Sequence, residues 1–157
     1  MGKIAWCRRQ RGGLKLIEPS SDISDGYLKM AKDSLDVMNR EKDKSLVFGV
    51  SAGYYSLYYS LYAVMQKIGV KSEIHSCSIF FMKNLLKEFY DLADVELVEL
   101  SFNLRNTLQY YVGRDVSQEK IIFLWESAYS FYVKSRDIVA GLSEKKINEI
   151  REKFENE

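Results

Sequence analysis

The sequence predicts an all-α protein, an up-and-down bundle of four to five antiparallel helices. Only one Pro and nine Gly occur in 157 residues, which favours long helices with short connections over a turn-rich β fold. Residues 45–69 form a run without charge until Lys67 and with apolar residues on every face, as in a buried helix. The flanking segments repeat apolar residues at three- and four-residue steps, which is typical of one-faced helices.

Composition predicts a folded chain and excludes a bulk attraction to polyanions. Hydrophobic residues make up 46% and charged residues 29% of the chain, and the net charge is +1. We expect neither a signal peptide nor a membrane span, because no apolar run of the required length is free of polar side chains. Cys7 and Cys77 are far apart and lack metal-ligand spacing. They therefore indicate two free thiols in a reducing compartment and a cytoplasmic location.

The positions of the helix-breaking residues divide the chain into three parts. Residues 1–20 are expected to be an irregular or weakly extended basic arm, because Gly12-Gly13 and Pro19 interrupt any helix. This arm could contact phosphates or remain a solvated tail. Residues 21–141 are expected to form the helical bundle. Residues 142–157 are expected to form a mostly charged peripheral helix that frays.

The expected helices are bounded by capping residues. Ser21 or Ser24 begins the first helix, Gly69 ends the second, and Ser117 begins the fifth. We expect a loop over 70–74 and no pair of strands. The expected helices span residues 21–40, 45–69, 75–90, 92–112, 118–139 and 144–154.

The second expected helix carries five tyrosines and a stripe of small residues. The tyrosines can pack in the core with their hydroxyls at its edge, and some can also reach a self-association surface. The small residues would let a neighbouring helix approach closely. The tyrosines are Tyr54, Tyr55, Tyr58, Tyr59 and Tyr62, and the small stripe is Gly49, Ala52, Ser56, Ser60 and Ala63.

Common catalytic signatures are absent from the sequence. It has no phosphate-binding glycine loop, no H-E-x-x-H and no C-x-x-C. His75 is the single histidine, and no companion ligands stand at helical spacing from it, so we expect no metal site and no cofactor. Its ordinary interpretation is a residue at a helix start that forms local hydrogen bonds.

Arg105 is the principal candidate for a binding role. It lies among apolar residues, with Asn106 beside it and Tyr110 shortly after. A guanidinium beside an amide and a phenol can grip a phosphate through forked hydrogen bonds. The alternative is a structural arginine paired with an acid on another helix. At about 100° per residue, Tyr110 lies roughly 140° around the helix from Arg105. The two share a site only if long side chains wrap into one groove or a second protomer completes it.

The order of these features resembles one protein family. A segment G-Y-Y-S-L-Y-Y-S-L-Y-A-V-M ends at Ile68-Gly69, His75 follows, and a later helix carries R-N-T-L-Q-Y from Arg105 to Tyr110. This is similar to the HEPN (higher eukaryote and prokaryote nucleotide-binding) domain family over residues 24–139. Family members share an A-Y-Y-x-x-F/Y-like segment, a downstream G…H, and an R-x-x-A-x-Y or R-x(4-6)-H motif.

The resemblance implies a helical bundle that is often a homodimer, and many members are metal-independent RNases of toxin–antitoxin pairs. Others act with a small nucleotidyltransferase partner or bind nucleotides. By this resemblance Arg105 matches the motif arginine and Asn106 its polar follower, while Tyr110 replaces the motif histidine. An unperturbed phenol has a pKa of about 10, which is poor for base catalysis at neutral pH. RNA cleavage without a metal is therefore not the expected activity, although Arg105 and Asn106 can still bind a phosphate. By the resemblance, the catalytic positions are Arg105, Asn106 and Tyr110, and the ligand-binding positions are these together with Gln109 and His75.

Three functions remain open on the sequence. The first is a homodimer that binds RNA or a nucleotide phosphate, with no catalysis or weak catalysis and with a possible nucleotidyltransferase partner. The second is an active endoribonuclease toxin in which Tyr110 or His75 assists Arg105. The third is a protein–protein interaction module in which the tyrosine helix is a docking surface. No membrane partner and no DNA specificity are implied.

Overall fold

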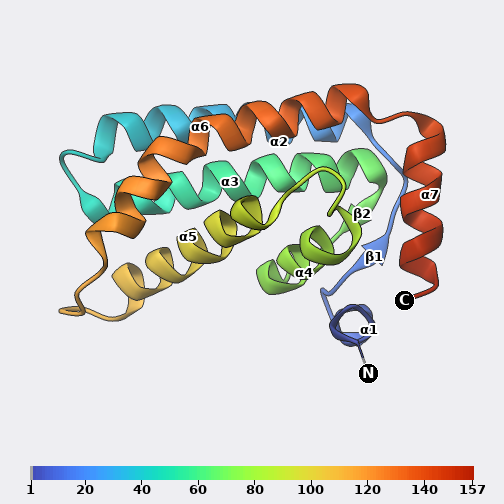
Figure 1. Ribbon diagram of the computed structural model, residues 1–157, viewed down its shortest axis with the longest axis horizontal. Helices are drawn as coiled ribbons and strands as arrows, with labels where there is room; N and C mark the ends of the chain where they lie inside the picture. Colours follow the sequence, from blue (N-terminus) through green and yellow to red (C-terminus); the bar gives the residue numbers. More distant parts are fainter. Residues whose placement is uncertain (1) are drawn as a thin grey trace.

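The central element is α3, Leu46–Ile68, around which the other helices pack. The computed structural model describes residues 2–157 and confirms the all-α class, with seven helices and one two-stranded sheet in that range. In Figure 1, α2, α3 and α6 run along the long axis of the molecule, and α5 descends at an angle from them. The elements are α1 Lys3–Arg9, β1 Lys15–Leu16, α2 Ser21–Glu41, α3, β2 Val70–Lys71, α4 His75–Leu85, α5 Leu92–Tyr110, α6 Gln118–Gly141 and α7 Glu144–Glu155.

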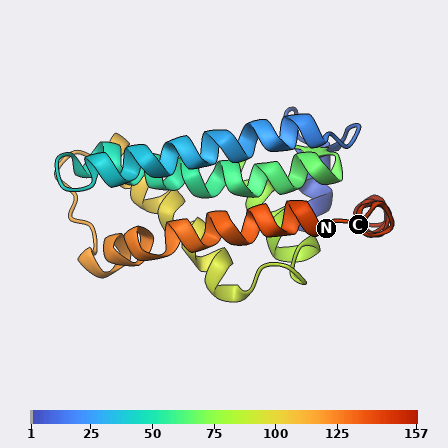
Figure 2. The ribbon, with the colours of Figure 1, turned by 90° about the horizontal axis from the view of Figure 1, so that it is seen from above.

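Helix α3 is buried on most of its faces, as its uncharged sequence predicts. Ser45 accepts a hydrogen bond from the Phe48 N–H at its start, and Gly69 ends it in the left-handed conformation at φ 84°. The small residues admit close neighbours. A Cβ added at Gly53 would lie 3.0 Å from Met38 Sδ of α2 and 3.1 Å from Leu124 Cδ2 of α6. Helices α2, α3 and α6 therefore lie side by side in Figure 2.

Helix α4 is shorter than the sequence predicts. It ends at Leu85, whereas its apolar pattern predicted a helix to residue 90. Leu86 leaves the helical conformation at φ −111° and ψ 18°, and Tyr90 is then buried with its hydroxyl 2.7 Å from Ser135 Oγ of α6. The tertiary contact of Tyr90 thus replaces the last helical turn. The neighbouring α5 begins with a reciprocal capping box between Asp91 and Asp94.

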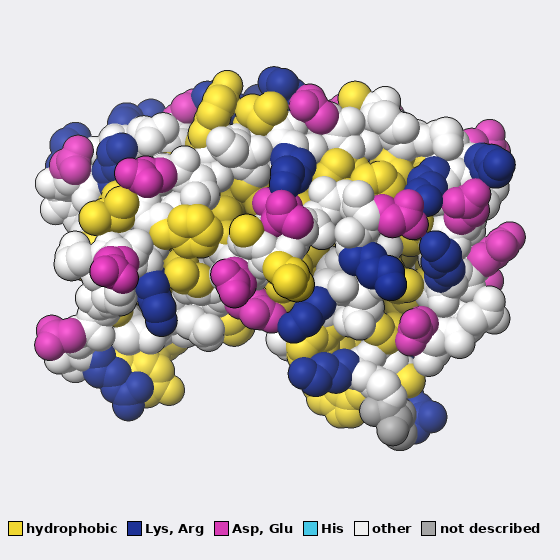
Figure 3. Space-filling model, viewed as in Figure 1, with side chains coloured by type: hydrophobic (Ala, Val, Ile, Leu, Met, Phe, Trp, Pro, Cys, Tyr) yellow, Lys and Arg dark blue, Asp and Glu magenta, His cyan; other side chains and the backbone are white. Residues whose placement is uncertain are grey.

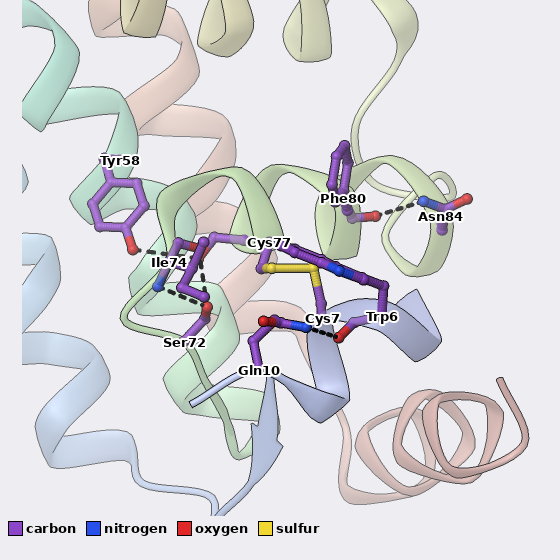
Figure 4. Close-up of a disulfide and its surroundings, with 10 residues drawn as sticks. Trp6, Cys7, Gln10, Tyr58, Ser72, Ile74, Cys77, Phe80 and Asn84 are labelled. Carbon is purple, nitrogen blue, oxygen red and sulfur yellow. Dashed lines mark hydrogen bonds between the residues drawn. A yellow bond between two sulfur atoms is a disulfide. The ribbon is translucent and has the colours of Figure 1, made fainter. Parts of the chain in front are cut away.

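The N-terminal arm is more ordered than the expectation of an irregular or weakly extended arm or a solvated tail, and only its short extended segment matches that expectation. It contains α1, and β1 pairs antiparallel with β2 where only a loop was expected. Leu14 is buried, and Cys7 and Cys77 form a disulfide rather than two free thiols. Figure 4 shows this bond joining α1 to the first turn of α4. The pairing could not be read from spacing because 70 residues separate the cysteines.

Helix α7 is held more firmly than its charged composition suggests. It lies across the end of the bundle, vertical in Figure 1 and end-on in Figure 2. Ile147, Ile150 and Phe154 are buried, so its three apolar residues all pack. Arg151 Nη1 donates to the carbonyls of Ile17, Ile68 and Gly69 at 2.8, 3.1 and 2.8 Å. The arm, the end of α3 and α7 are therefore tied together at one point.

Across residues 2–157, no helix is both long and apolar enough to cross a lipid bilayer.

Candidate phosphate-binding site around Arg105

Arg105 lies in the middle of the contact between α5 and α3. Its Nη1 donates to Asn106 Oδ1 and its Nη2 donates to the Tyr55 hydroxyl, both at 3.2 Å. The guanidinium carbon lies 5.2 Å from the Tyr54 ring centroid and 5.4 Å from that of Tyr55. The two aromatic rings therefore hold the cation in place without neutralising it.

The guanidinium retains unused donor capacity. Arg105 Nε is buried and has no hydrogen-bond partner among residues 2–157, and no ion pair joins Arg105 to a carboxylate in that range. Of the five N–H groups of an arginine, two are engaged here. The sequence-based alternative, an arginine paired with an acid on another helix, is wrong for the described chain. A buried donor left unsatisfied is uncommon and points to a missing acceptor.

His75 and Arg105 both contact Tyr54. It is the first residue of α4, and its Nδ1 forms a short hydrogen bond with the Tyr54 hydroxyl of α3. Its ring stacks on Tyr58 with centroids 4.0 Å apart. The expectation of purely local hydrogen bonds is therefore wrong, because the imidazole bridges two helices. Arg105 contacts the ring face of Tyr54, whose hydroxyl contacts His75, so one tyrosine links the two candidates.

The protonation states follow from burial. Burial, and then the charge of Arg105, lowers the pKa of His75 below its ordinary value, so the imidazole is neutral at pH 7. Burial raises the pKa of the Tyr54 phenol, so this hydroxyl stays protonated. Tyr54 is then the donor and His75 Nδ1 the acceptor, which leaves the imidazole proton on Nε2. In this state His75 has one N–H group, at Nε2, that can donate to another group, and it has no free lone pair.

Two residues predicted at the site form no hydrogen bond with Arg105 within residues 2–157. Tyr110 is the last residue of α5 and is 67% exposed, and no hydrogen bond or ring contact joins it to Arg105 within residues 2–157. Gln109 Nε2 donates instead to Ser51 Oγ of α3 at 3.0 Å. The angular offset of about 140° explains the position of Tyr110. Gln109, four residues after Arg105, shares its face of α5 and contacts α3 one helical turn away from Tyr55.

The tyrosines of α3 are the site residues that the sequence reasoning did not assign. Tyr54, Tyr55 and Tyr58 surround Arg105 and His75, although they were interpreted as core or association residues. Their spacing carried a usable signal. Tyr54 and Tyr58 are four residues apart and so share a helix face, and Tyr55 lies on the adjacent face with Tyr59. Two tyrosine faces on one helix can enclose a cation from a neighbouring helix.

The donor set suits an anion. Donor groups come from three helices near Arg105, namely its guanidinium on α5, tyrosine hydroxyls on α3 and the imidazole N–H of His75 on α4, and none of these groups is a carboxylate. Within the described chain, no group of three or more His, Cys, Asp or Glu side chains is placed to hold a metal ion. A phosphate oxygen is the acceptor that best matches a guanidinium with spare N–H groups.

Another groove lies elsewhere and is lined mainly by apolar side chains. It encloses about 630 Å³ beside α6. Its one cation, Lys134, is ion-paired with Asp94 at 2.6 Å. This groove therefore lacks a charge available for an anionic ligand. Its lining comprises Phe89, Tyr129, Ser130, Val133, Lys134, Asp137, Ile138 and Gly141.

Comparison of the chain with protein-family models and with curated protein sequences gives no match in either case.

Proposed function

We propose that this protein is a HEPN-type helical protein that binds the phosphate of RNA or of a nucleotide through Arg105 and Asn106. One observation carries the proposal: Arg105 is a partly buried cation with no carboxylate partner in residues 2–157 and with an unsatisfied Nε. His75 supports it by adding a neutral N–H donor nearby. The family resemblance supplies the ligand class, and the site chemistry agrees with it.

A ribonuclease toxin is the second candidate, and the position of His75 favours it. The position of the motif histidine is occupied by Tyr110, but the imidazole of His75 on α4 is hydrogen-bonded to Tyr54, whose ring contacts Arg105. Its Nδ1 is engaged by Tyr54, so base catalysis requires the opposite tautomer, with Tyr54 turning its proton away. Phosphate binding needs no such rearrangement and is therefore the leading function.

A homodimer is part of the proposal, and an apolar end of the bundle supports it. The six residues concerned come from the first turn of α3, the end of α5 with the turn after it, and the first turns of α6. A cluster of exposed apolar side chains of this kind is typical of an interaction surface. A nucleotidyltransferase is the alternative partner. The residues are Phe48, Tyr110, Tyr111, Val112, Ile122 and Phe123.

A cytoplasmic location stays a prediction. Its main support was a pair of free thiols, and the Cys7–Cys77 disulfide removes that support. Cytosolic reductants keep most protein thiols reduced. Alkylation and mass spectrometry of the protein from its native cells would decide the oxidation state there.

The test is a pair of assays on purified protein. Binding of a fluorescent mononucleotide and cleavage of mixed RNA in EDTA would be measured for wild type, Arg105→Ala and Arg136→Ala. Arg136 is an exposed arginine of α6 paired with Asp137, so its removal matches the change in net charge. Losing hydrogen bonds to a charged group should weaken phosphate binding about 10- to 100-fold in Arg105→Ala.

The outcomes separate the three functions. Binding that depends on Arg105 without cleavage supports the leading proposal. Cleavage by wild type and Arg136→Ala, but not by Arg105→Ala, would make the ribonuclease toxin the leading function. If wild type, Arg105→Ala and Arg136→Ala are all folded and bind each ligand with the same affinity, the proposal is overturned and an interaction module is favoured.

A further inference from the structure

The half-buried tyrosines of α2 and α3 form a continuous row that starts at Arg105. Tyr55, which accepts the hydrogen bond from Arg105, stacks on Tyr59 with centroids 5.5 Å apart. Tyr59 contacts Tyr27 of α2 at 5.9 Å, and Tyr27 meets Tyr62 edge-to-face at 4.8 Å. Each of these four rings is partly exposed. We call Tyr55, Tyr59, Tyr27 and Tyr62 the tyrosine row.

The far end of the row meets a cluster of cations. The Tyr62 hydroxyl accepts from the Ser72 N–H at 3.2 Å, and Ser72 directly follows Lys71 of β2. Lys71 shares a depression of about 270 Å³ with Arg11 and Lys15 of the N-terminal arm. None of the three cations has an ion-pair partner in the described chain.

One carboxylate also belongs to this depression. The lining includes Glu73, whose backbone N–H donates to the Gly12 carbonyl at 2.7 Å, so three cations face one anion. The disulfide and the pairing of β1 with β2 hold the arm in this position. Figure 3 shows Lys and Arg side chains over the lobe that contains α1, while both signs of charge are mixed over the rest of the visible face. The basic arm is thus a fixed part of the surface.

The tyrosine hydroxyls of the row can act as uncharged hydrogen-bond donors to a ligand. The hydroxyls of Tyr55 and Tyr62 are engaged, whereas those of Tyr27 and Tyr59 have no hydrogen-bond partner within residues 2–157. Burial raises the pKa of Tyr59 and of Tyr62, which keeps these phenols protonated at physiological pH. Protonated phenols donate to phosphate and base acceptors, and their rings offer apolar contact to bases.

We infer that the tyrosine row and the cation cluster of Arg11, Lys15 and Lys71 bind a single strand of nucleic acid whose phosphate is held at Arg105. The inference rests on the proposed function and specifies its ligand. Aromatic side chains combined with cations along a strand are the usual means of binding unpaired nucleic acid. Bases in a duplex are stacked on one another and cannot reach the rings.

The length of the row determines the size of the ligand. Tyr55 and Tyr62 are seven residues apart on α3, which is about 10 Å at 1.5 Å per residue, and the cation cluster lies beyond Tyr62. A mononucleotide at Arg105 therefore leaves most of the row and the cluster unused. Affinity should rise with strand length until both ends of the row are occupied, and it should fall with salt as phosphates contact the cations.

The test compares UMP, a 12-nucleotide 2′-O-methyl oligouridylate that resists cleavage, and a 12-base-pair duplex, each fluorescently labelled. Affinities would be measured by anisotropy for wild type, Tyr59→Leu and the matched control Tyr129→Leu, an exposed tyrosine of α6 outside the row. Loss of one stacked base should weaken oligouridylate binding about 5- to 100-fold in Tyr59→Leu. UMP binding by Tyr59→Leu and oligouridylate binding by Tyr129→Leu should not change.

A second variant tests the cation cluster without touching the aromatic packing. Lys71→Ser should reduce the slope of log affinity against log salt for the oligouridylate by about 0.7, the value for one phosphate contact on a single strand. Unfolding curves would confirm that each variant is folded.

Three results would overturn the inference. They are an oligouridylate that binds no tighter than UMP, a duplex that binds as tightly as the strand, or equal oligouridylate affinity in folded wild type and Tyr59→Leu. If UMP still binds through Arg105 in these cases, the proposed function stands. If neither UMP nor the strand binds, both the inference and the proposed function fail.

Discussion

Two partly buried arginines of this molecule have opposite surroundings. Arg151 of α7 donates to three backbone carbonyls, those of Ile17, Ile68 and Gly69, and so satisfies the end of α3 and the N-terminal arm together. Arg105 of α5 contacts one amide oxygen and one phenol and leaves its buried Nε without a partner in the described chain. The first arginine stabilises the fold through three backbone contacts, whereas the second has few polar partners. Burial alone therefore does not distinguish the two arginines, but their hydrogen-bond partners do.

The largest effect is expected from the disulfide, which holds the same end of the molecule as Arg151. Removing a cross-link that closes a loop of 70 residues should lower the free energy of unfolding by about 4 kcal/mol. The measurement is urea unfolding of the double variant Cys7→Ala, Cys77→Ala, followed by tryptophan fluorescence. If the disulfide end of the molecule and the site around Arg105 are independent, the phosphate affinity of the folded variant will equal that of wild type. A loss of affinity without a loss of stability would contradict this separation.

The direct comparison of the two arginines should give an intermediate effect. Arg151→Met leaves buried carbonyls without a donor and should lower the free energy of unfolding by roughly 2–4 kcal/mol. Arg105→Met removes a cation that no carboxylate within residues 2–157 compensates, so the loss of unfolding free energy should stay below about 1 kcal/mol. Phosphate affinity should fall in Arg105→Met and stay close to the wild-type value in Arg151→Met. Equal destabilisation by both variants would show that Arg105 is structural after all.

The smallest effect concerns the titration of His75. Its pKa should lie below about 6.5, mainly through burial and secondarily through Arg105, so Arg105→Met should raise this pKa only part of the way. The unfolded chain binds the proton first as pH falls. Stability should therefore decrease from pH 6.5 down to the folded-state pKa and not change further below it on account of this residue.

The measurement for His75 is an NMR titration of the imidazole, which is unambiguous because the chain has one histidine. Bound phosphate should raise the pKa, since a negative charge nearby favours the imidazolium. A pKa at or above 6.5 in the free protein would exclude the buried, cation-adjacent environment described for His75.

The long helices were predictable because their signals are local. Ser45 and Gly69 bound α3 as capping chemistry requires, and Ser117 begins α6 as expected. The end of α4 was predicted wrongly because Tyr90 finds its hydroxyl partner on α6, a contact 45 residues away. The disulfide and the pairing of β1 with β2 were missed for the same reason, since each joins segments that share no local pattern.

The candidate site likewise contains residues that the sequence identified and residues that only the structure identified. Arg105 and Asn106 stood out in the sequence because a cation and an amide interrupt an apolar helix, and the structure brings His75 close to them. Tyr110, expected beside Arg105, lies at the exposed end of α5 instead. The partners that do surround Arg105 are Tyr54 and Tyr55, because α5 packs on α3 at this level of the bundle.

By itself, the sequence determined the helical class, the central buried helix and the identity of the unusual arginine. These follow from periodicity, capping and composition, which act over a few residues. Only the tertiary structure decided that no acid within residues 2–157 pairs with Arg105 and that Arg105 and His75 both contact Tyr54. It also decided that the basic arm is folded against the end of the tyrosine row. Each of these depends on which helices pack together and at what height, and such contacts join residues too far apart in the chain for any local pattern to specify.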